Sequence, residues 1–400
     1  MPDLPPLLSL EEAQRRILDR VAPLATEQVG LTEAAGRILA EAASARVDLP
    51  PFDSSAMDGF AVRSEDTPGR LPVLERIAAG RPASRPLGAR AAMGIATGAA
   101  VPDGADAVIP LEDVAEADND IEIGARVEAG AHIRPRGGDL RAGDVVIAAG
   151  QRLGPAQLGA LAAAGVADIS SSIRPRAAVL STGSELRRPG ETLEPGQIYE
   201  ANSILLGAQL ESAGARVEQL DAVVDDEAAH RAALERGLES DLLVTSGGVS
   251  VGPHDLVRSV GAELGVEEVL WGVAVKPGKP LWFGVRDRTL VFGLPGNPVS
   301  SLVCFELFVR PAVLALQRAS EQLPSFEPGR LARSLRPNAV RTELVRARSR
   351  VVDGGIELEV LTGQDSHMIA RAAGANALVL IPAGESELEA GAPVSFLRLA

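Results

Sequence analysis

The chain has 400 residues, and its 54 acidic and 39 basic residues give a formal net charge of −15. This length allows roughly two to four domains, and the ordinary apolar and charged contents argue against wholesale disorder. The acidic balance argues against nucleic acid and against an anionic membrane surface as partners.

We expect neither a membrane span nor a secretory signal. No apolar run approaches the ~20 residues that a span requires, and the N-terminus lacks a basic region followed by a long apolar one. The lone Cys304 excludes an internal disulfide and a cysteine metal cluster, and we expect it in the core. These features predict a cytoplasmic globular protein.

The first predicted elements are helices. Ser9 and Glu12 form a capping box before an apolar pattern, and a second helix is expected from about Thr32 to Ala43. From Leu49 to about Gly150, short runs broken by Gly and Pro predict a small β-rich unit. Gly154 and Pro155 then open another short helix, to about Ala164.

From about Arg174 the pattern alternates between strands and helices, which is typical of a mostly parallel sheet with helices on both faces. From about Phe326 short alternating runs return and predict a small β-barrel or sandwich. The expected strands are Ala177–Ser181, Arg216–Val223, Asp241–Ser246, Glu268–Val275, Leu281–Val285, Thr289–Gly293, Leu344–Val352 and Leu378–Ile381. The expected helices are Ala201–Ala213, Asp226–Glu239, Pro253–Leu264 and Pro298–Leu316, the last bent at Pro311.

The lysines are unusually placed. Of the 39 basic residues, only Lys276 and Lys279 are lysines, and they lie three residues apart beside a Gly-Pro turn. Arg is a flat fork of donors, whereas Lys is a compact point charge. We therefore expect the pair to hold a small oxyanion, although chance survival of two lysines in an Arg-rich chain is the alternative.

Three predicted strands end in small-residue loops that lead into helices. Such loops gather at the carboxyl edge of a doubly wound sheet, where ligands bind. Their backbone N–H groups and the following helix N-termini favour a phosphate, and Asn297 before Pro298 is expected to cap its helix. The loop residues expected to bind a phosphorylated ligand are Thr182, Gly183, Ser184, Ser246, Gly247, Gly248, Ser250, Gly252, Pro295, Gly296, Asn297 and Pro298.

Acidic residues accompany these loops. Glu185, Asp225 and Asp255 lie close to them in the sequence, and carboxylates beside a phosphate site suit Mg²⁺. One of the pair Asp225 and Asp226 is expected to cap the following helix instead. His254 is a possible metal ligand, but a surface or capping role fits it better, and the serines lack the sequence context of a hydrolase triad.

Outside the α/β region, two features offer anion contacts. Arg134 and Arg136 share a turn with Asp139, and Arg346, Arg348 and Arg350 alternate at strand spacing, which predicts a basic face. A solvated surface would explain each feature alone.

Seven segments follow one another in the chain: PFDSSAMDGFAV, ATGAAVPDGADAVI, IRPRGGDL, STGSEL, TSGGVSVGPHD, KPGKPLWFG and GLPGNPVSS. In this order they resemble the molybdopterin molybdenumtransferases, the MoeA and gephyrin E-domain family, across nearly the whole chain. The resemblance implies an enzyme of molybdenum cofactor biosynthesis. It would insert molybdate into adenylylated molybdopterin and release AMP, with Mg²⁺ as cofactor.

The resemblance also implies a four-part architecture. A helical linker domain would comprise residues 1–45 and 151–173, and a β-rich insertion domain residues 46–150. A doubly wound α/β molybdopterin-binding domain would follow at 174–325, and a C-terminal β-barrel at 326–400. The family forms elongated homodimers with the active site between subunits, where the insertion of one faces the α/β domain of the other.

The resemblance also implies roles for individual residues. Lys276 and Lys279 would hold molybdate, and Glu185, Asp225 and Asp255 would hold Mg²⁺. The catalytic set is expected to be Asp58, Thr97, Asp139, Glu185, Lys276 and Lys279, the first three lining the cleft from the insertion. Further partners would be a molybdopterin-adenylylating enzyme and molybdoenzyme chaperones.

Two other functions stay open at this point. Gephyrin-like members also act as scaffolds that bind receptor peptides. A related α/β enzyme adenylylates molybdopterin and shares the TSGG-type loop, but it would not need the first 170 residues or the barrel.

Overall fold

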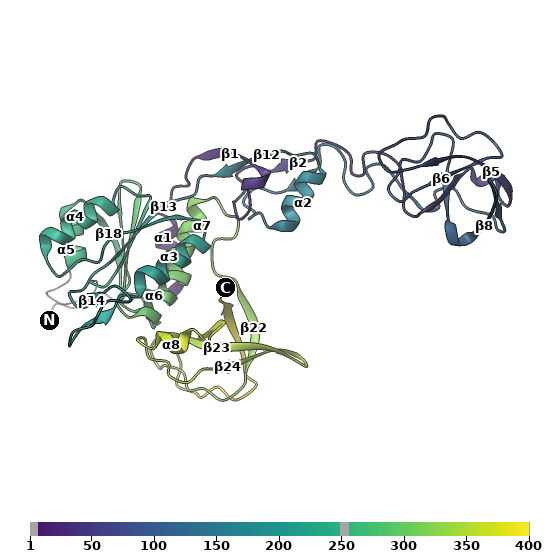
Figure 1. The fold of residues 1–400 in the computed structure, drawn as a ribbon. Coiled ribbons are helices and arrows are strands. Elements are labelled where there is room, and N and C mark those ends of the chain that lie inside the picture. Colours follow the sequence, from purple (N-terminus) through teal and green to yellow (C-terminus); the bar gives the residue numbers. More distant parts are fainter. Residues whose placement is uncertain (1–6, 249–255, 400) are drawn as a thin grey trace.

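The structure is a computed structural model that describes residues 7–248 and 256–399. The molecule is elongated (Figure 1). An α/β unit and a β-barrel lie at one end, a small mixed unit lies in the middle, and a β-rich unit lies at the far end. We call these the α/β unit, the barrel, the middle unit and the distal unit.

The α/β unit is built on a six-stranded sheet in the order β16-β13-β17-β21-β20-β18. The first four strands pair in parallel, and β20 and β18 extend the sheet antiparallel. The predicted mostly parallel sheet is thus confirmed, with an antiparallel edge that arises because only Asp287 and Arg288 join β20 to β21. The strands are β13 (Arg176–Ser181), β16 (Arg216–Gln219), β17 (Leu242–Ser246), β18 (Glu267–Trp271), β20 (Trp282–Arg286) and β21 (Thr289–Leu294).

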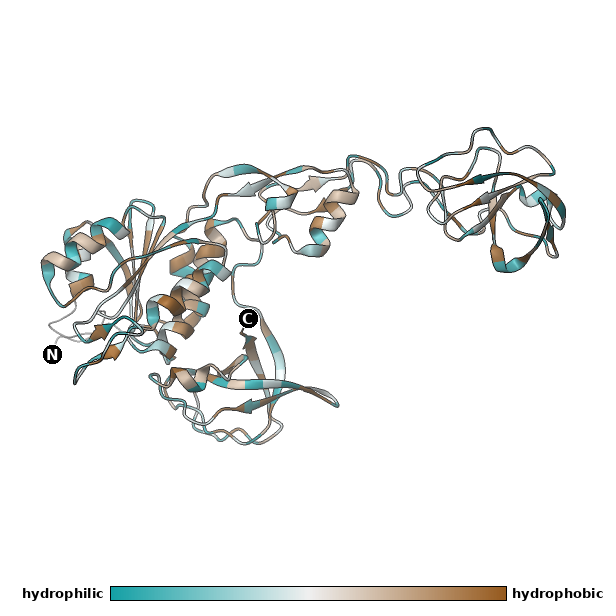
Figure 2. Cartoon of the chain, viewed as in Figure 1, coloured by the Kyte–Doolittle hydropathy of each residue, from teal (hydrophilic) through white to brown (hydrophobic). Residues whose placement is uncertain are grey.

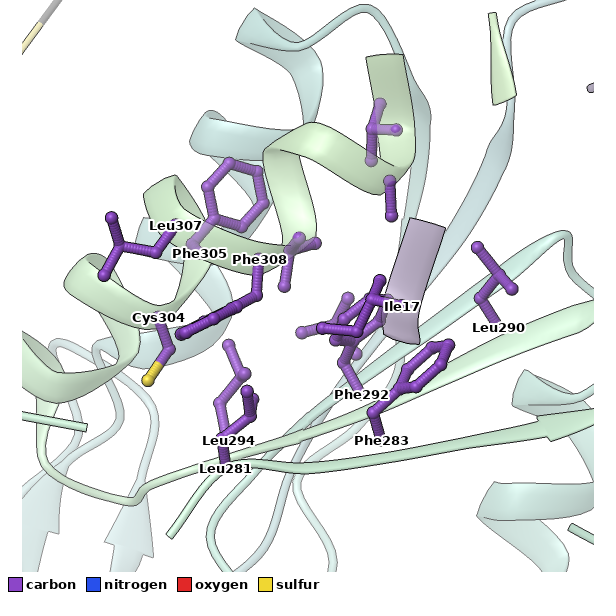
Figure 3. Packing of buried hydrophobic residues seen from close by; sticks show 14 of the residues in the cluster. Ile17, Leu281, Phe283, Leu290, Phe292, Leu294, Cys304, Phe305, Leu307 and Phe308 are labelled. Carbon is purple, nitrogen blue, oxygen red and sulfur yellow. The ribbon is translucent and has the colours of Figure 1, made fainter. Parts of the chain in front are cut away.

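Helices cover both faces of this sheet, as predicted. Ala177 and Val179 of β13 belong to one core and Ala178 and Leu180 to another, because side chains alternate along a strand. Figure 3 shows the first core, and Figure 2 shows hydrophobic residues gathered in the sheet and the helices beside it. The first core includes α1 (Leu10–Leu18), α3 (Asn202–Ser212), α6 (Pro298–Cys304) and α7 (Arg310–Leu316); the second includes α4 (Glu227–Gly237) and α5 (Leu256–Glu263).

The helix predicted over Pro298–Leu316 is interrupted by a wider turn. The π-helical segment η4 (Phe305–Val309) separates α6 from α7, just before Pro311. Proline lacks an N–H and its ring crowds the preceding turn, so widening accommodates it. This stretch of 19 residues, with mean hydropathy 1.8, is apolar enough to span a membrane, contrary to our expectation, but 83% of it is buried in the core.

The middle unit corrects a helix prediction. Residues 32–43 were expected to form a helix, but only the short 3-10 turn η1 (Leu31–Glu33) forms, and then Ile38 and Leu39 bridge to Arg152 and Ser171. Gly36 at φ 73° breaks the helical path, and distant segments supply the pairing. The unit contains β1 (Thr26–Gly30), which pairs with β12 (Asp168–Ser172), β2 (Ala43–Ser44), which pairs with β11 (Val145–Ile147), and the expected helix α2 (Pro155–Ala163).

The N-terminal helix lies outside the middle unit. Ser9 Oγ accepts a hydrogen bond from Glu12 N at 3.1 Å and so caps α1, as predicted. The Glu12 carboxylate does not complete a capping box, because it binds Arg15 and Arg16. Ile17 packs into the first core of the α/β unit, so α1 belongs to that unit rather than to a helical linker.

The distal unit is β-rich, as predicted. Six strands form a sheet in the order β7-β4-β6-β5-β9-β8, and β3 pairs with β10. The strands are β3 (Ser54–Ser55), β4 (Gly59–Val62), β5 (Gly69–Ile77), β6 (Ala92–Ile95), β7 (Ala107–Pro110), β8 (Val114–Ala117), β9 (Asp120–Ile123) and β10 (Ile133–Arg134), with 3-10 turns η2 (Ser64–Asp66) and η3 (Leu111–Asp113).

The C-terminal strands close into a barrel. Strands β23, β24, β22, β26 and β25 are neighbours in that order, and β25 pairs again with β23. A sixth strand, β19, joins β23 from the α/β unit, so a main-chain ladder connects the two units. The elements are β19 (Val275–Lys276), β22 (Phe326–Leu331), β23 (Thr342–Val352), β24 (Gly355–Val360), α8 (Ile369–Ala372), β25 (Ala377–Ile381) and β26 (Pro393–Arg398).

Candidate functional site

The three small-residue loops meet at one sheet edge. Ser181, Ser246 and Leu294 end adjacent parallel strands in register, and backbone hydrogen bonds of 3.0 Å run from Thr182 N to Ser246 O and from Gly247 N to Leu294 O. The loops line a cavity of about 590 Å³. We call it the loop cavity.

Residues of the loop cavity come from six segments of the chain. The predicted ones are Thr182, Glu185, Ser246, Gly248, Pro295, Gly296, Asn297 and Pro298; the others are Ser181, Leu186, Ile198, Tyr199, Glu200, Ala201, Asn202, Pro280, His367 and Ile369.

Gly247 allows the first two loops to lie close together. Its φ is 95°, and a Cβ at this position would lie 2.7 Å from the carbonyl oxygen of Thr182. Any side chain would therefore separate the loops. The continuation of the second loop, with Ser250 and Gly252, lies outside the described residues.

The first loop carries the expected carboxylates. A Cβ on Gly183 would lie 2.5 Å from Glu185 Oε2, so the Glu185 carboxylate folds over Gly183. Ser184 Oγ donates to Asp225 Oδ2 at 3.2 Å and accepts from Asp225 N at 3.1 Å. Asp226 Oδ1 accepts from Ala229 N at 2.9 Å and caps α4, so the capping alternative holds for Asp226.

These carboxylates are compatible with Mg²⁺. The described residues contain no group of three or more His, Cys, Asp or Glu side chains that could hold a metal, while the expected ligand Asp255 and the alternative His254 lie outside the described part. Glu185 and Asp225, on neighbouring loops, are both exposed. Mg²⁺ usually takes one or two carboxylates plus waters and phosphate oxygens, so Glu185 on the loop cavity and Asp225 on the adjoining loop fit it.

Two cavity residues were missed in the sequence. Asn202 Nδ2 donates to Ser246 Oγ and to Gly296 O, each at 2.7 Å, and so links two loops. The buried Glu200 accepts from Ser181 Oγ at 2.7 Å and from Ser203 N at 2.8 Å. Their signal was their position at the start of the helix predicted over Ala201–Ala213.

Asn297 corrects a capping prediction. It occupies the position before α6, but its side chain makes no capping hydrogen bond. Instead Nδ2 donates to Ser366 Oγ at 2.8 Å and ties the third loop to the barrel.

Both lysines line a second cavity of about 710 Å³ between the α/β unit and the barrel. We call it the lysine cavity. Its barrel side offers Arg336 and Arg341, which the sequence did not single out. The lysine cavity and the loop cavity adjoin, because both are lined by Pro280, Pro295, Asn297 and His367.

The two lysines differ in their contacts. Lys276 Nζ lies 2.6 Å from Glu343 Oε1, beside the β19–β23 pairing that places the two residues opposite each other. Lys279 is exposed and forms no ion pair among residues 7–248 and 256–399. Glu343 therefore neutralises one lysine and leaves the other open to a ligand.

Cys304 lies beneath the lysine loop. It is fully buried, its Sγ donates to Gly278 O at 3.6 Å, and burial raises the pKa of its thiol to about 12. The prediction of a core cysteine is confirmed.

The predicted basic face of the tail is wrong for Arg346, while Arg348 and Arg350 are exposed as expected. Arg346 is buried and donates to Gly363 O at 2.8 Å and to Met368 O at 3.0 Å, and burial lowers the pKa of its guanidinium. Arg348 donates to Gly374 O at 2.8 Å, and Arg350 pairs with Glu359 at 2.7 Å. All three cations stabilise the barrel itself.

The expected catalytic residues of the insertion line neither the loop cavity nor the lysine cavity; they are Asp58, Thr97 and Asp139. Asp58 Oδ1 accepts from Thr97 N at 2.7 Å, so these two are brought together in the distal unit. Asp139 N donates to Leu49 O at 2.9 Å. Within one chain, the distal unit and the α/β unit lie at opposite ends of the molecule (Figure 1), so Asp58 and Thr97 do not reach the lysines.

Comparisons with known proteins cover nearly the whole chain. Residues 8–165 match the MoeA N-terminal region (domain I and II), residues 178–315 a probable molybdopterin binding domain, and residues 328–399 the MoeA C-terminal region (domain IV).

Relatives that match the chain over its full length support the same family. The chain is 40% identical over 403 residues to molybdopterin molybdenumtransferase 2 of Mycobacterium tuberculosis, covering 96% of this chain and 97% of that protein. It is 34% identical over 396 residues to the molybdopterin molybdenumtransferase of Haemophilus influenzae, covering 97% and 98%. The crystal structure of the molybdopterin biosynthesis moeA protein from Pyrococcus horikoshii OT3 is similar with a TM-score of 0.84 and 28% identity, over 98% of this chain and 100% of that one.

The fold and the loop cavity define a multidomain α/β protein with a molybdopterin-binding type of domain. Its full-length relatives specify the family further. The chain belongs to the molybdopterin molybdenumtransferase (MoeA) family, a family of transferases in molybdenum cofactor biosynthesis.

Proposed function

We propose that this protein inserts molybdate into adenylylated molybdopterin and releases AMP. The observation that carries the proposal is the junction of two unlike cavities. The only two lysines of the chain line one cavity, and it adjoins a second that is lined by three small-residue loops. A small dianion and a phosphorylated organic molecule can therefore lie next to each other.

The loops would bind the phosphates. The loop N–H groups after β13, β17 and β21 that are not used between the strands, with the N-terminus of α6, favour negative charge. The Asn202 amide fixes two of these loops relative to each other, so the phosphate contacts are in place before the substrate arrives. Such preorganisation is how positioning lowers a barrier.

The lysines would hold molybdate. Both are point charges that can approach a tetrahedral dianion from different directions. Lys279 is open to solvent, while the main-chain pairing of β19 with β23 fixes the position of Lys276. The lysines would thus hold molybdate at the border of the loop cavity, beside the dithiolene sulfurs of the bound pterin.

Glu185 and Asp225 would hold Mg²⁺. When bound, the ion would offset negative charge on the phosphoanhydride as water cleaves it to AMP and the molybdopterin phosphate. The carboxylates lie on loops anchored by Ser184 and by the ladder to Ser246, so they would keep their positions while the anhydride breaks.

We also propose a homodimer with shared active sites and four domains. Three of them are 46–150, 174–325 and 326–400, and the fourth joins 151–173 to the part of 1–45 that follows α1, since α1 packs in the α/β unit. Asp58, Thr97 and Asp139 would approach the lysine cavity of the other subunit. The elongated shape supports this proposal, because a distal unit far from its own cavity is free to meet a second copy. We expect a cytoplasmic protein that receives its substrate from a molybdopterin-adenylylating enzyme and passes its product to molybdoenzyme chaperones.

The test is an assay of AMP release from adenylylated molybdopterin with and without molybdate. We expect release that depends on molybdate and on Mg²⁺. Adenylylation of molybdopterin from ATP would instead indicate the adenylylating activity, and no turnover in either assay would indicate a scaffold.

A further inference from the structure

Tyr199 is the only tyrosine of the chain, and it lines the loop cavity. It is 47% exposed, and the neighbouring Ile198 is 54% exposed. Two large side chains that line a cavity and leave this much surface in solvent are available to contact a ligand.

The Tyr199 ring is held in place. Its hydroxyl donates to Glu191 O at 2.9 Å, and its strand, β15 (Ile198–Tyr199), pairs with β14 (Leu186–Arg187). A hydrogen bond of 2.8 Å from Glu200 N to Arg187 O continues this pairing. The ring is therefore fixed at its hydroxyl end and at its backbone.

The faces of this ring have no aromatic partner. In the described part of the chain, Tyr199 neither stacks on another ring nor lies under a guanidinium. Its hydroxyl bond orients the ring without covering it. A fixed ring with free surface is suited to a flat ligand.

A second observation points to a ligand in the same cavity. Asn202 Oδ1 is buried and has no hydrogen-bond partner among the described residues, while its Nδ2 is fully used by Ser246 and Gly296. The carbonyl of Gly296 can only accept, which fixes the amide orientation. An unpaired buried acceptor is costly, and a small shift of the Asn202 side chain toward the cavity that it lines would let the edge N–H of a nitrogen heterocycle satisfy it.

We propose that Tyr199 is the platform against which a flat nitrogen-heteroaromatic ring of the substrate packs. The inference rests on the proposed function, because adenylylated molybdopterin carries two such rings, the pterin and the adenine. Both share the chemistry that the cavity recognises. Tyr199 would set the affinity for the organic substrate, whereas the lysines would set the affinity for the oxyanion.

The single tyrosine allows a direct measurement. Biosynthetic labelling with 3-fluorotyrosine gives one ¹⁹F signal, at position 199. We expect an upfield ring-current shift on titration with a stacking ligand, with AMP as the adenine probe and neopterin monophosphate as the pterin probe. A shift with only one probe identifies the ring that packs there, and a shift with both shows that the platform accepts either.

Variants separate packing from a structural role. Tyr199→Leu should raise the KM for adenylylated molybdopterin about tenfold with a smaller change in kcat, since stacking contributes to binding. Tyr199→Phe keeps the ring and should stay within about twofold of wild type. Ile204→Ser is the control, because Ile204 is 55% exposed on α3 but lines a neighbouring cavity rather than this one. It should leave the KM unchanged.

Failure of this inference is distinguishable from failure of the proposed function. A ¹⁹F signal that neither saturating probe moves, in a protein that still releases AMP in a molybdate-dependent way, would overturn the platform and leave the function standing. An equal loss of kcat in the Leu and Phe variants, without a change in KM, would overturn it as well. A shifted signal without molybdate-dependent release would support the platform and refute the transferase.

Discussion

The loop cavity and the lysine cavity are built in different ways. The loop cavity takes its three loops from neighbouring strands of one sheet, so its geometry follows from the register of Ser181, Ser246 and Leu294. The lysine cavity lies between two units, with the lysine loop on one side and Arg336 and Arg341 of the barrel on the other. The strand register of one sheet determines the geometry of the loop cavity, whereas the packing of the barrel against the α/β unit determines the geometry of the lysine cavity.

The two cavities also differ in charge. Glu185 and Glu200 bring carboxylates to the loop cavity, which suits a cation and the phosphates that it neutralises. Two lysines and two arginines bring positive charge to the lysine cavity, and Glu343 and Asp365 offset part of it. Under the proposed function the two reactants would occupy separate sites, and the following predictions test that separation.

The largest effect is expected at the lysines. Lys276→Arg and Lys279→Arg should each fold but lose molybdate-dependent AMP release about 100-fold or more, because a planar fork cannot replace a point charge against a small dianion. Turnover at limiting molybdate and the melting temperature are the measurements. Near-normal turnover in either variant would show that the cavity only requires positive charge.

The next prediction concerns the distal unit as a wall of the partner's lysine cavity. Asp58→Ala and Lys279→Ala should each be inactive alone, yet mixing them with subunit exchange should restore about a quarter of wild-type activity. In each heterodimer, one active site would contain both substitutions and the other active site would contain neither. If verified heterodimers stay inactive, Asp58 and Lys279 serve the same subunit's site.

Carboxylate variants should act on the loop cavity and not on molybdate. Glu185→Gln and Asp225→Asn should each raise the Mg²⁺ concentration for half-maximal activity about tenfold, because one of few ligand charges is lost. Titrations of activity and calorimetric Mg²⁺ binding would measure the change, while the KM for molybdate should stay constant.

Asp226→Asn is the matched control for this experiment. It removes a neighbouring charge but keeps a good N-cap for α4, so its Mg²⁺ titration should match wild type. If Asp226→Asn behaves like Asp225→Asn, the effect is long-range electrostatics rather than coordination.

The smallest effect is expected at Glu343. Glu343→Gln keeps a hydrogen-bond acceptor beside Lys276 but removes the charge that neutralises it. The KM for molybdate should therefore fall about two- to fivefold at low salt, and the gain should shrink as salt screens it. Glu359→Gln, which breaks the pair with Arg350 within the barrel, should leave the KM unchanged. An unaltered or higher KM in Glu343→Gln would mean that the pair only positions Lys276.

The sequence alone determined the features that arise from local pattern. Alternating strands and helices specified the parallel part of the sheet, because strand ends with glycine loops have to meet at one edge. Ser9 capped α1 as predicted, and the apolar surroundings of Cys304 placed it in the core. The rarity of lysine in the sequence singled out Lys276 and Lys279, and both line one cavity in the structure.

Only the tertiary structure decided what depends on partners distant in the chain. Ile38 and Leu39 became extended because residues 151–172 pair with them. Arg346 lost its expected exposed position because the segment 363–368 folds over its guanidinium, whose N–H groups donate to the carbonyls of Gly363 and Met368. The contacts of Asn202 and Glu343 could not be read from the sequence. Asn202 binds Gly296, which is 94 residues away, and Glu343 of the barrel binds Lys276 of the α/β unit. Short-range propensity acts within a few residues, whereas the burial and pairing that override it are properties of the folded chain.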